Sequence, residues 1–134
     1  PGVEARQLGS ITEVAAAADV LVVAVPANAE TRHLMNADVF AAMKPTAYFI
    51  NIARGDVMDE AALVGALQGG EIAGAGLDVY EFEPKVSPGL LGMENVTLLP
   101  HLGTAALEVR EGMGMMAVEN LVAWDEGRAL PNPV

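Results

Sequence analysis

Three side chains of this 134-residue chain follow apolar, strand-like runs and could together carry out one reaction. Arg54 follows AYFINIA, Glu83 follows AGAGLDVYEF and His101 follows VTLLP. They supply a permanent cation, a carboxylate and an imidazole that titrates near neutrality. A guanidinium can hold a carboxylate with two hydrogen bonds, and an imidazole can donate the proton that a carbonyl oxygen needs when it is reduced. The set is therefore suited to the reduction of a 2-oxo acid.

The elements that must position these side chains alternate between strand-like and helix-like segments, the pattern of a parallel sheet with crossover helices. We expect strands over residues 19–25, 47–53, 73–80 and 96–100, and helices over residues 11–18, 37–43, 59–70 and 104–127. Ser10 with Glu13 forms a capping box for the first helix, Asn36 or Ala37 begins the second, and Thr104 caps the last. Because the carboxyl ends of parallel strands share one edge, the three reactive side chains should meet there.

The expected sheet has fewer strands than a complete doubly wound domain, which has about six. In such a domain the first βα turn carries phosphate-binding glycines, and no GxGxxG sequence occurs in this chain. We therefore expect an α/β fold, the C-terminal portion of a Rossmann-type doubly wound parallel sheet in which the first βαβ unit and its glycine-rich turn are absent. The alternative is a different fold.

Composition excludes several classes of function. The formal net charge of -11 argues against nucleic acid as a partner and is explained by solubility. The chain has no cysteine, so disulfides and thiolate metal sites are excluded, and with two histidines no metal site is expected. No apolar run approaches the roughly 18 residues of a membrane span, and the first residues lack the layout of a signal peptide. We expect a cytoplasmic protein without a membrane partner.

Three motifs in a fixed order, NIARGDVMDEAAL, GAGLDVYEFEP and LLPHLG, together with VVAVPANAETRHLMN, resemble the D-isomer-specific 2-hydroxyacid dehydrogenase family over nearly the whole chain. The stretch from PKVSPGLLG to MAVENL is most similar to the glyoxylate and hydroxypyruvate reductase branch. The resemblance implies that residues 1–127 are part of an NAD(P)-binding Rossmann domain, including its long final helix. Residues 128–134 would be a tail that returns toward a substrate domain outside this chain.

By the same resemblance, Arg54 binds the substrate carboxylate and polarises the 2-oxo group, assisted by Gly55, which lets the backbone turn tightly. His101 is the general acid in reduction and the base in oxidation, and Glu83 keeps the imidazole protonated and oriented. Each residue also has a structural interpretation. Arg54 could form a surface salt bridge with Asp56 or Glu60, and His101 could be a structural hydrogen-bonding group.

Glu81 is a rival to Glu83 for the carboxylate role, and the position before a proline favours Glu83. Asp78 lies in an apolar run, where a carboxylate needs a partner. It either lies against the nicotinamide or caps backbone amides. The resemblance implies NAD or NADP as cofactor, bound by residues from several loops: Pro26, Thr31, Ile52, Ala53, Arg54, Asp78, His101 and Gly103. His33, the second histidine, is expected to be exposed in a polar turn.

The final helix carries a methionine-rich apolar side that includes Met113 and Met116, expected to be either core or a partner surface. The resemblance favours an oxidoreductase that transfers a hydride between NAD(P)H and a small 2-oxo acid, giving a D-2-hydroxy acid, and acts as a homodimer. An NADH-sensing, corepressor-like interaction module is the alternative. Without a glycine-rich turn, residues 1–134 alone are expected to be an inactive fragment of the dehydrogenase.

Overall fold

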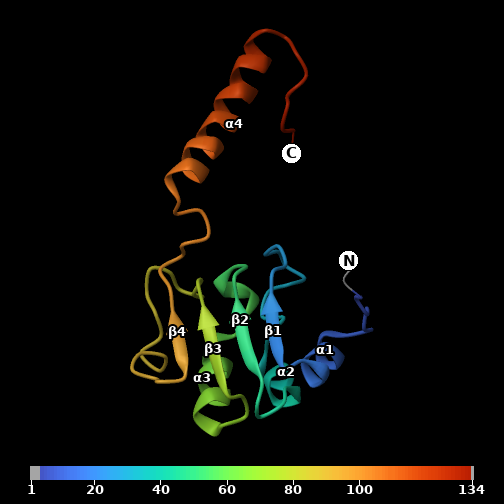
Figure 1. The fold of residues 1–134 in the computed structure, drawn as a ribbon, viewed down its shortest axis with the longest axis vertical. Helices are drawn as coiled ribbons and strands as arrows, with labels where there is room; N and C mark the ends of the chain where they lie inside the picture. Colours follow the sequence, from blue (N-terminus) through green and yellow to red (C-terminus); the bar gives the residue numbers. More distant parts are fainter. Residues whose placement is uncertain (1–3, 134) are drawn as a thin grey trace. The chain divides into compact units, whose positions relative to one another are not determined.

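The computed structural model describes residues 4–133 and divides into two compact units, Pro1–Pro100 and His101–Val134. The first unit contains a sheet of four parallel strands, β1 Val20–Val23, β2 Tyr48–Asn51, β3 Gly74–Leu77 and β4 Val96–Leu98, in the order β1-β2-β3-β4 (Figure 1). The expected α/β class and parallel sheet are confirmed. All four carboxyl ends lie at one edge of this sheet.

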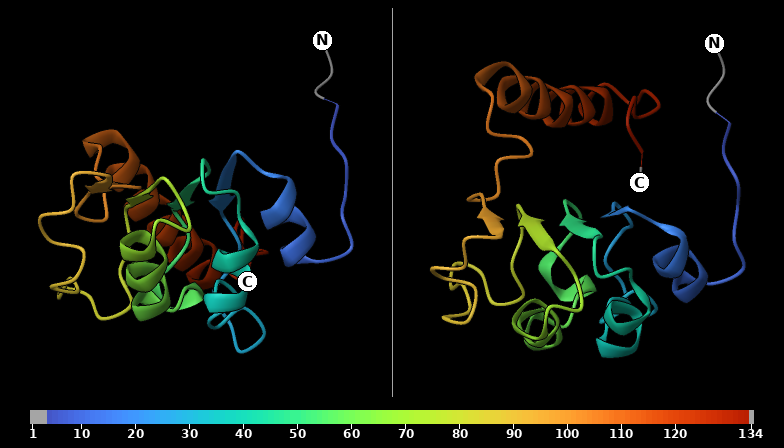
Figure 2. Two further views of the ribbon diagram at one scale, coloured as in Figure 1. Left: turned by 90° about the horizontal axis from the view of Figure 1, so that it is seen from below. Right: turned by 60° about the horizontal axis from the view of Figure 1, so that its bottom comes forward.

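Helices α2 (Ala37–Ala42) and α3 (Glu60–Gly69) connect the strands and cover one face of the sheet, and α1 (Ile11–Ala17) precedes β1 (Figure 2). Each of these helices begins with a side-chain cap. The Glu13 N–H donates to Ser10 Oγ at 3.2 Å, the Val39 N–H to Asn36 Oδ1 at 3.1 Å, and the Ala62 N–H to Asp59 Oδ1 at 3.0 Å. The starts expected near Ser10 and Asn36 are therefore confirmed.

The hydrophobic core lies between the sheet and these helices. Phe40 of α2 and Phe49 of β2 are fully buried and meet edge to face, with ring centroids 5.1 Å apart. Alternate residues of the first two strands point to the other face, where Val20, Val22 and Tyr48 are at least half exposed. Packing of one sheet face against the helices therefore fixes the positions of the strand ends.

The second unit consists mainly of the 19-residue helix α4, Leu107–Asp125. The cap predicted at Thr104 is wrong: the helix is preceded by Ala106, which makes no side-chain cap hydrogen bond, and the Thr104 carbonyl accepts a bond from Arg110 Nε. Thr104 lies too far upstream for its hydroxyl to serve as the cap. Met113 and Met116 are about half exposed and are not among the buried core residues, and the partner-surface interpretation stays a prediction.

The tail after α4 turns back on it, because the Asn132 N–H donates to Asn120 Oδ1 at 3.0 Å. Among residues 4–133, no helix combines the length and the apolar character that crossing a membrane requires.

Candidate active site

Arg54 is placed by Asn51, the last residue of β2, which sequence reasoning did not single out. Asn51 is fully buried. Its Oδ1 accepts the Ala53 N–H at 3.0 Å and its Nδ2 donates to the Arg54 carbonyl at 3.0 Å, so one side chain shapes the turn between strand and arginine. A polar residue inside the apolar run AYFINIA was the available signal, because a buried amide must satisfy its hydrogen bonds.

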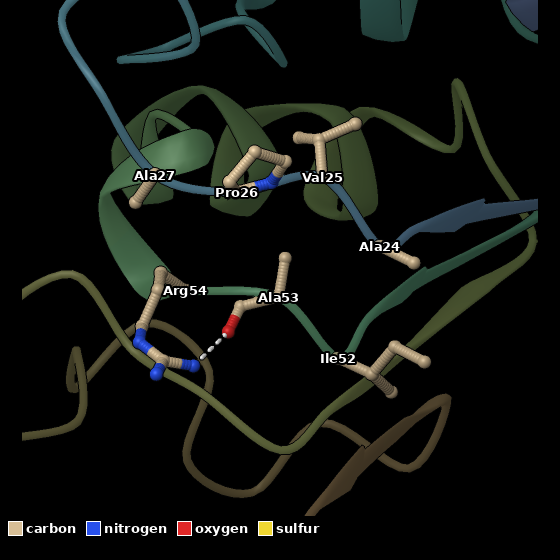
Figure 3. Close-up of a pocket in the computed structure, with 7 residues that line it drawn as sticks. All are labelled: Ala24, Val25, Pro26, Ala27, Ile52, Ala53 and Arg54. Atoms are coloured by element: carbon tan, nitrogen blue, oxygen red, sulfur yellow. Dashed lines mark hydrogen bonds between the residues drawn. The ribbon is translucent and has the colours of Figure 1, made fainter. Parts of the chain in front are cut away.

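The Arg54 side chain is exposed, and its Nη1 donates to the Ala53 carbonyl at 2.7 Å (Figure 3). Within residues 4–133 the structure shows no ion pair between this guanidinium and Asp56 or Glu60. Glu60 is 2% exposed, and its carboxylate accepts backbone N–H groups instead. The salt-bridge interpretation of Arg54 therefore fails.

The tight turn predicted after Arg54 is present as a 3-10 turn over Gly55–Val57, and what requires glycine at position 55 is the close approach of another loop. The φ of Gly55 is not in the left-handed region, so conformational freedom is not what the position requires. A Cβ at Gly55 would lie 1.9 Å from the Tyr80 carbonyl carbon and oxygen and 2.4 Å from the Glu81 nitrogen. The loop after β2 and the loop after β3 are thus in direct backbone contact.

This contact brings Arg54 and Glu83 together although they are far apart in the sequence. Both residues line one pocket of about 420 Å³ at the carboxyl ends of the strands. Glu83 is exposed, and its Oε1 accepts the Tyr80 N–H at 3.0 Å, which fixes its side chain against the start of its own loop. A guanidinium and a carboxylate bordering one opening can bind an anionic substrate and hold a neighbouring proton donor.

Glu81 also lines this pocket, and both of its carboxylate oxygens have partners. Its Oε1 lies 2.7 Å from His33 Nε2, and its Oε2 accepts the Glu60 N–H at 3.2 Å. The expectation that His33 is exposed is therefore wrong: the ring is about one-third exposed and paired. Its partner lies 48 positions away in the sequence, so local polarity could not reveal the pairing.

A second pocket, of about 450 Å³, lies beside the first, at the ends of β1 and β2 (Figure 3). Its walls come from two short segments in which every side chain except that of Arg54 is apolar: Ala24, Val25, Pro26, Ala27, Ile52, Ala53 and Arg54. The structure thus brings four of the expected cofactor residues, Pro26, Ile52, Ala53 and Arg54, to one pocket. Thr31 is outside this lining, and its Oγ1 donates to the Pro26 carbonyl at 2.8 Å, which holds the loop after β1 in place.

Asp78 is the first residue after β3 and is half-buried, and its N–H donates to the Asn51 carbonyl at 3.1 Å. It therefore lies at the same sheet edge as the two pockets. His101 and Gly103 belong to the second unit and are exposed. His101 has a left-handed backbone with φ of 54°, and the roles of these two residues stay predictions.

Tyr80 also lines the Arg54 and Glu83 pocket and is 8% exposed. Its hydroxyl donates to the Leu99 carbonyl at 2.7 Å, joining the loop after β3 to the residues that follow β4. Burial raises the pKa of the Tyr80 phenol above its usual 10.0, and the charge of Asp78 adds to this rise. No group of three or more metal-ligating side chains occurs among residues 4–133.

Comparison with known proteins finds similar sequences and similar structures. Residues 3–103 match the model of the D-isomer specific 2-hydroxyacid dehydrogenase, NAD binding domain. The chain is 46% identical to hydroxyphenylpyruvate reductase of Plectranthus scutellarioides, over all of this chain and 43% of that protein. It is 50% identical to glyoxylate/hydroxypyruvate reductase B of Shigella boydii over 117 residues, 87% of this chain and 36% of that protein.

Among solved structures, the chain matches the NADPH-dependent glyoxylate/hydroxypyruvate reductase of Sinorhizobium meliloti in complex with NADP and malonate. The TM-score is 0.91 at 44% identity, covering 98% of this chain and 43% of the other. The chain therefore spans about two fifths of the length of the relatives it matches.

Proposed function

The chain belongs to the D-isomer specific 2-hydroxyacid dehydrogenase family, and we propose that the whole protein reduces a small 2-oxo acid with NAD(P)H to a D-2-hydroxy acid. One observation carries this proposal: Arg54 and Glu83, from the ends of neighbouring parallel strands, line the same pocket. The names of the relatives, hydroxyphenylpyruvate, glyoxylate and hydroxypyruvate reductases, support a 2-oxo acid as substrate, of glyoxylate or hydroxypyruvate size. They do not favour an NADH-sensing module.

In the proposed reaction Arg54 binds the substrate carboxylate and polarises the adjacent 2-oxo group. A guanidinium has five N–H donors, and within the described residues one of them is used, by the Ala53 carbonyl. The remaining donors can hold a carboxylate with two parallel hydrogen bonds, which fixes both its position and its plane. A substrate anchored in this way presents its carbonyl carbon in one orientation, the condition for a single product stereoisomer.

The proton is supplied by His101 in this proposal. Reduction adds a hydride to the carbonyl carbon and a proton to the carbonyl oxygen, so the imidazolium loses one proton for each hydroxy acid formed. Glu83 accepts a hydrogen bond from the ring and stabilises its protonated form. Glu83 is exposed at the pocket, as this role requires.

The pocket at the ends of β1 and β2 fits the nicotinamide end of the cofactor. Its lining of small apolar side chains, with Ile52 57% exposed, offers a surface against which a flat ring can pack. Pro26, Ile52 and Ala53 would hold that ring, Thr31 would keep the loop in shape, and Asp78 and Gly103 complete the proposed set. When bound, NAD(P)H supplies the hydride.

The test is steady-state oxidation of NADH and NADPH by the whole protein with glyoxylate or hydroxypyruvate. Hydroxyacetone is the matched control substrate, because it has a methyl group where hydroxypyruvate has its carboxylate. We expect turnover of both acids, D-glycerate as the product of hydroxypyruvate by chiral chromatography, and negligible turnover of hydroxyacetone. Tight NADH binding with no turnover of any 2-oxo acid would reject the reductase and favour the NADH-sensing module.

Domain limits, assembly and location are part of the same proposal. Residues 1–127 form the part of the NAD(P)-binding domain carried by this chain, and residues 128–134 form a tail that leads to the substrate domain. The exposed apolar side chains of α4 support a homodimer, which light scattering on the whole protein would test. The absence of cysteine is consistent with a cytoplasmic location.

A further inference from the structure

Three segments that are separate in the sequence meet behind the Arg54 and Glu83 pocket. The segment from His33 to Met35 is joined to the loop after β2 by backbone hydrogen bonds: His33 N–H to the Asp56 carbonyl at 2.9 Å and Met35 N–H to the Val57 carbonyl at 3.0 Å. This loop carries Arg54 two residues before Asp56. The position of His33 is therefore tied to the position of the loop that carries Arg54.

The ring of His33 also contacts the third segment, the loop after β3 that contains Glu81 and Glu83. Nε2 lies 2.7 Å from Glu81 Oε1, and Glu81 is two residues before Glu83. The Glu81 side chain is 8% exposed and that of His33 is 34% exposed, so the carboxylate is largely shielded from water and the ring is partly shielded. Shielding makes such a contact stronger and more directional than a surface ion pair.

The other side of Glu81 is fixed to the start of α3. Its Oε2 accepts the Glu60 N–H at 3.2 Å, and its own N–H donates to Glu60 Oε2 at 3.0 Å. Glu60 Oε1 in turn accepts the Ser87 N–H at 2.8 Å, at the far end of the same loop. The loop from Glu81 to Ser87 is thus held to α3 by Glu60, and it is joined to the loop that carries Arg54 through the ring of His33 and the backbone contact at Gly55.

We propose that His33 is a positioning residue that sets the separation of Arg54 and Glu83 through the hydrogen bond between its ring and Glu81. In this proposal His33 touches neither substrate nor cofactor. Its ring links the loop after β2, which carries Arg54, to the loop after β3, which carries Glu83. This inference rests on the proposed reductase function, because it concerns the two groups which that reaction uses. His33 itself adopts a left-handed backbone with φ of 49°, a conformation that few non-glycine residues adopt.

The left-handed backbone decides which variants test the proposal. His33→Gly removes the ring while suiting the observed φ, whereas His33→Gln keeps a side-chain N–H that can reach the carboxylate. Glu81→Gln removes the charge but keeps both contacts, because its carbonyl oxygen can accept the Glu60 N–H while its amide donates to a neutral imidazole. Lys44→Gln is the matched control: it removes an ion pair of similar length, 2.8 Å to Asp19 Oδ1, away from the pocket.

The experiment measures kcat per active site in the whole protein, with sites counted by NAD(P)H binding, and KM for NAD(P)H separately. We expect His33→Gly to lower kcat about tenfold or more, since a misplacement near 1 Å costs about 100-fold. KM for NAD(P)H should not change. His33→Gln and Glu81→Gln, which keep a hydrogen bond between the two side chains, should keep most of the wild-type kcat, and Lys44→Gln should match the wild type.

If His33 had only a structural role, His33→Gly would lower the melting temperature and the number of active sites but not kcat per site. An active wild type whose His33→Gly variant keeps its kcat, or whose glycine and glutamine variants are equally impaired, would overturn the positioning role alone. A wild type that reduces no small 2-oxo acid would overturn the proposed function first, and the positioning role with it.

Discussion

Gly55→Ala is the substitution that most directly tests the backbone contact between the two pocket loops. The added Cβ would lie 1.9 Å from the Tyr80 carbonyl, and real contacts of this kind essentially never fall below 3.0 Å. The obstacle is backbone on both sides, so no side chain can rotate away. The loops must separate by about 1.1 Å, the shortfall between those two distances.

That separation moves Arg54 and the loop that carries Glu83 apart. A displacement of about 1 Å between groups that hold a substrate costs about 100-fold in rate. Overpacking of a well-packed contact also costs about 1–3 kcal/mol of stability. We therefore expect kcat/KM for the 2-oxo acid to fall about 100-fold in the whole protein, with unfolding in urea shifted to a lower midpoint.

Gly65→Ala provides the matched control. Gly65 lies inside α3, is exposed, and has no atom within 4 Å of an added Cβ. The same chemical change there should raise stability by about 0.5–1 kcal/mol, because alanine is the better helix former. It should leave kcat/KM unchanged. A Gly55→Ala protein that folds with wild-type kcat/KM would refute the backbone contact as the feature that aligns the pocket.

Other substitutions test single contacts. Tyr80→Phe removes the hydroxyl bound to the Leu99 carbonyl and should cost about 1 kcal/mol at pH 8. Because the folded pKa of Tyr80 is raised above 10.0, the unfolded chain loses this proton first, so wild-type stability should fall as pH rises above 10 and the phenylalanine variant should lack that part of the loss. Equal alkaline slopes in urea titrations would contradict this. Gly70→Ala forces a side chain into the left-handed cap of α3, φ 69°, and should lower stability by about 1 kcal/mol; an unchanged urea midpoint would argue against the cap. His101→Ala should lower kcat for reduction roughly 100-fold or more, and an active variant would remove the histidine from the proposed mechanism.

The order and type of the elements in the first unit could be predicted from the sequence because apolar runs and caps are local signals. The residues at which these elements end could not be predicted. The run expected as a strand over residues 47–53 stops at Asn51, where the buried amide takes over the backbone groups of the turn. The run expected over residues 73–80 stops at Leu77, and the Tyr80 N–H binds Glu83 instead of a neighbouring strand.

The acids around the pocket show why the site was harder to predict than the fold. Glu60 looks like an ordinary exposed residue at the start of a helix, yet it is buried because its carboxylate accepts two backbone N–H groups from the loop after β3. Because the Glu60 carboxylate binds these backbone groups, it does not pair with Arg54. No local pattern encodes it, since the donors lie 21 and 27 positions away.

The choice between Glu81 and Glu83 rests on the same long-range contacts. In the sequence both acids flank Phe82, and only the following proline favoured Glu83. In the structure Glu81 has one oxygen on His33 and the other on the Glu60 N–H, so both oxygens take part in holding the loop. Glu83 binds the Tyr80 N–H through one oxygen and is exposed at the pocket beside Arg54. Glu81 thus helps to hold the loop, and the place of Glu83 beside Arg54 at the pocket supports the prediction that Glu83 is the partner of His101.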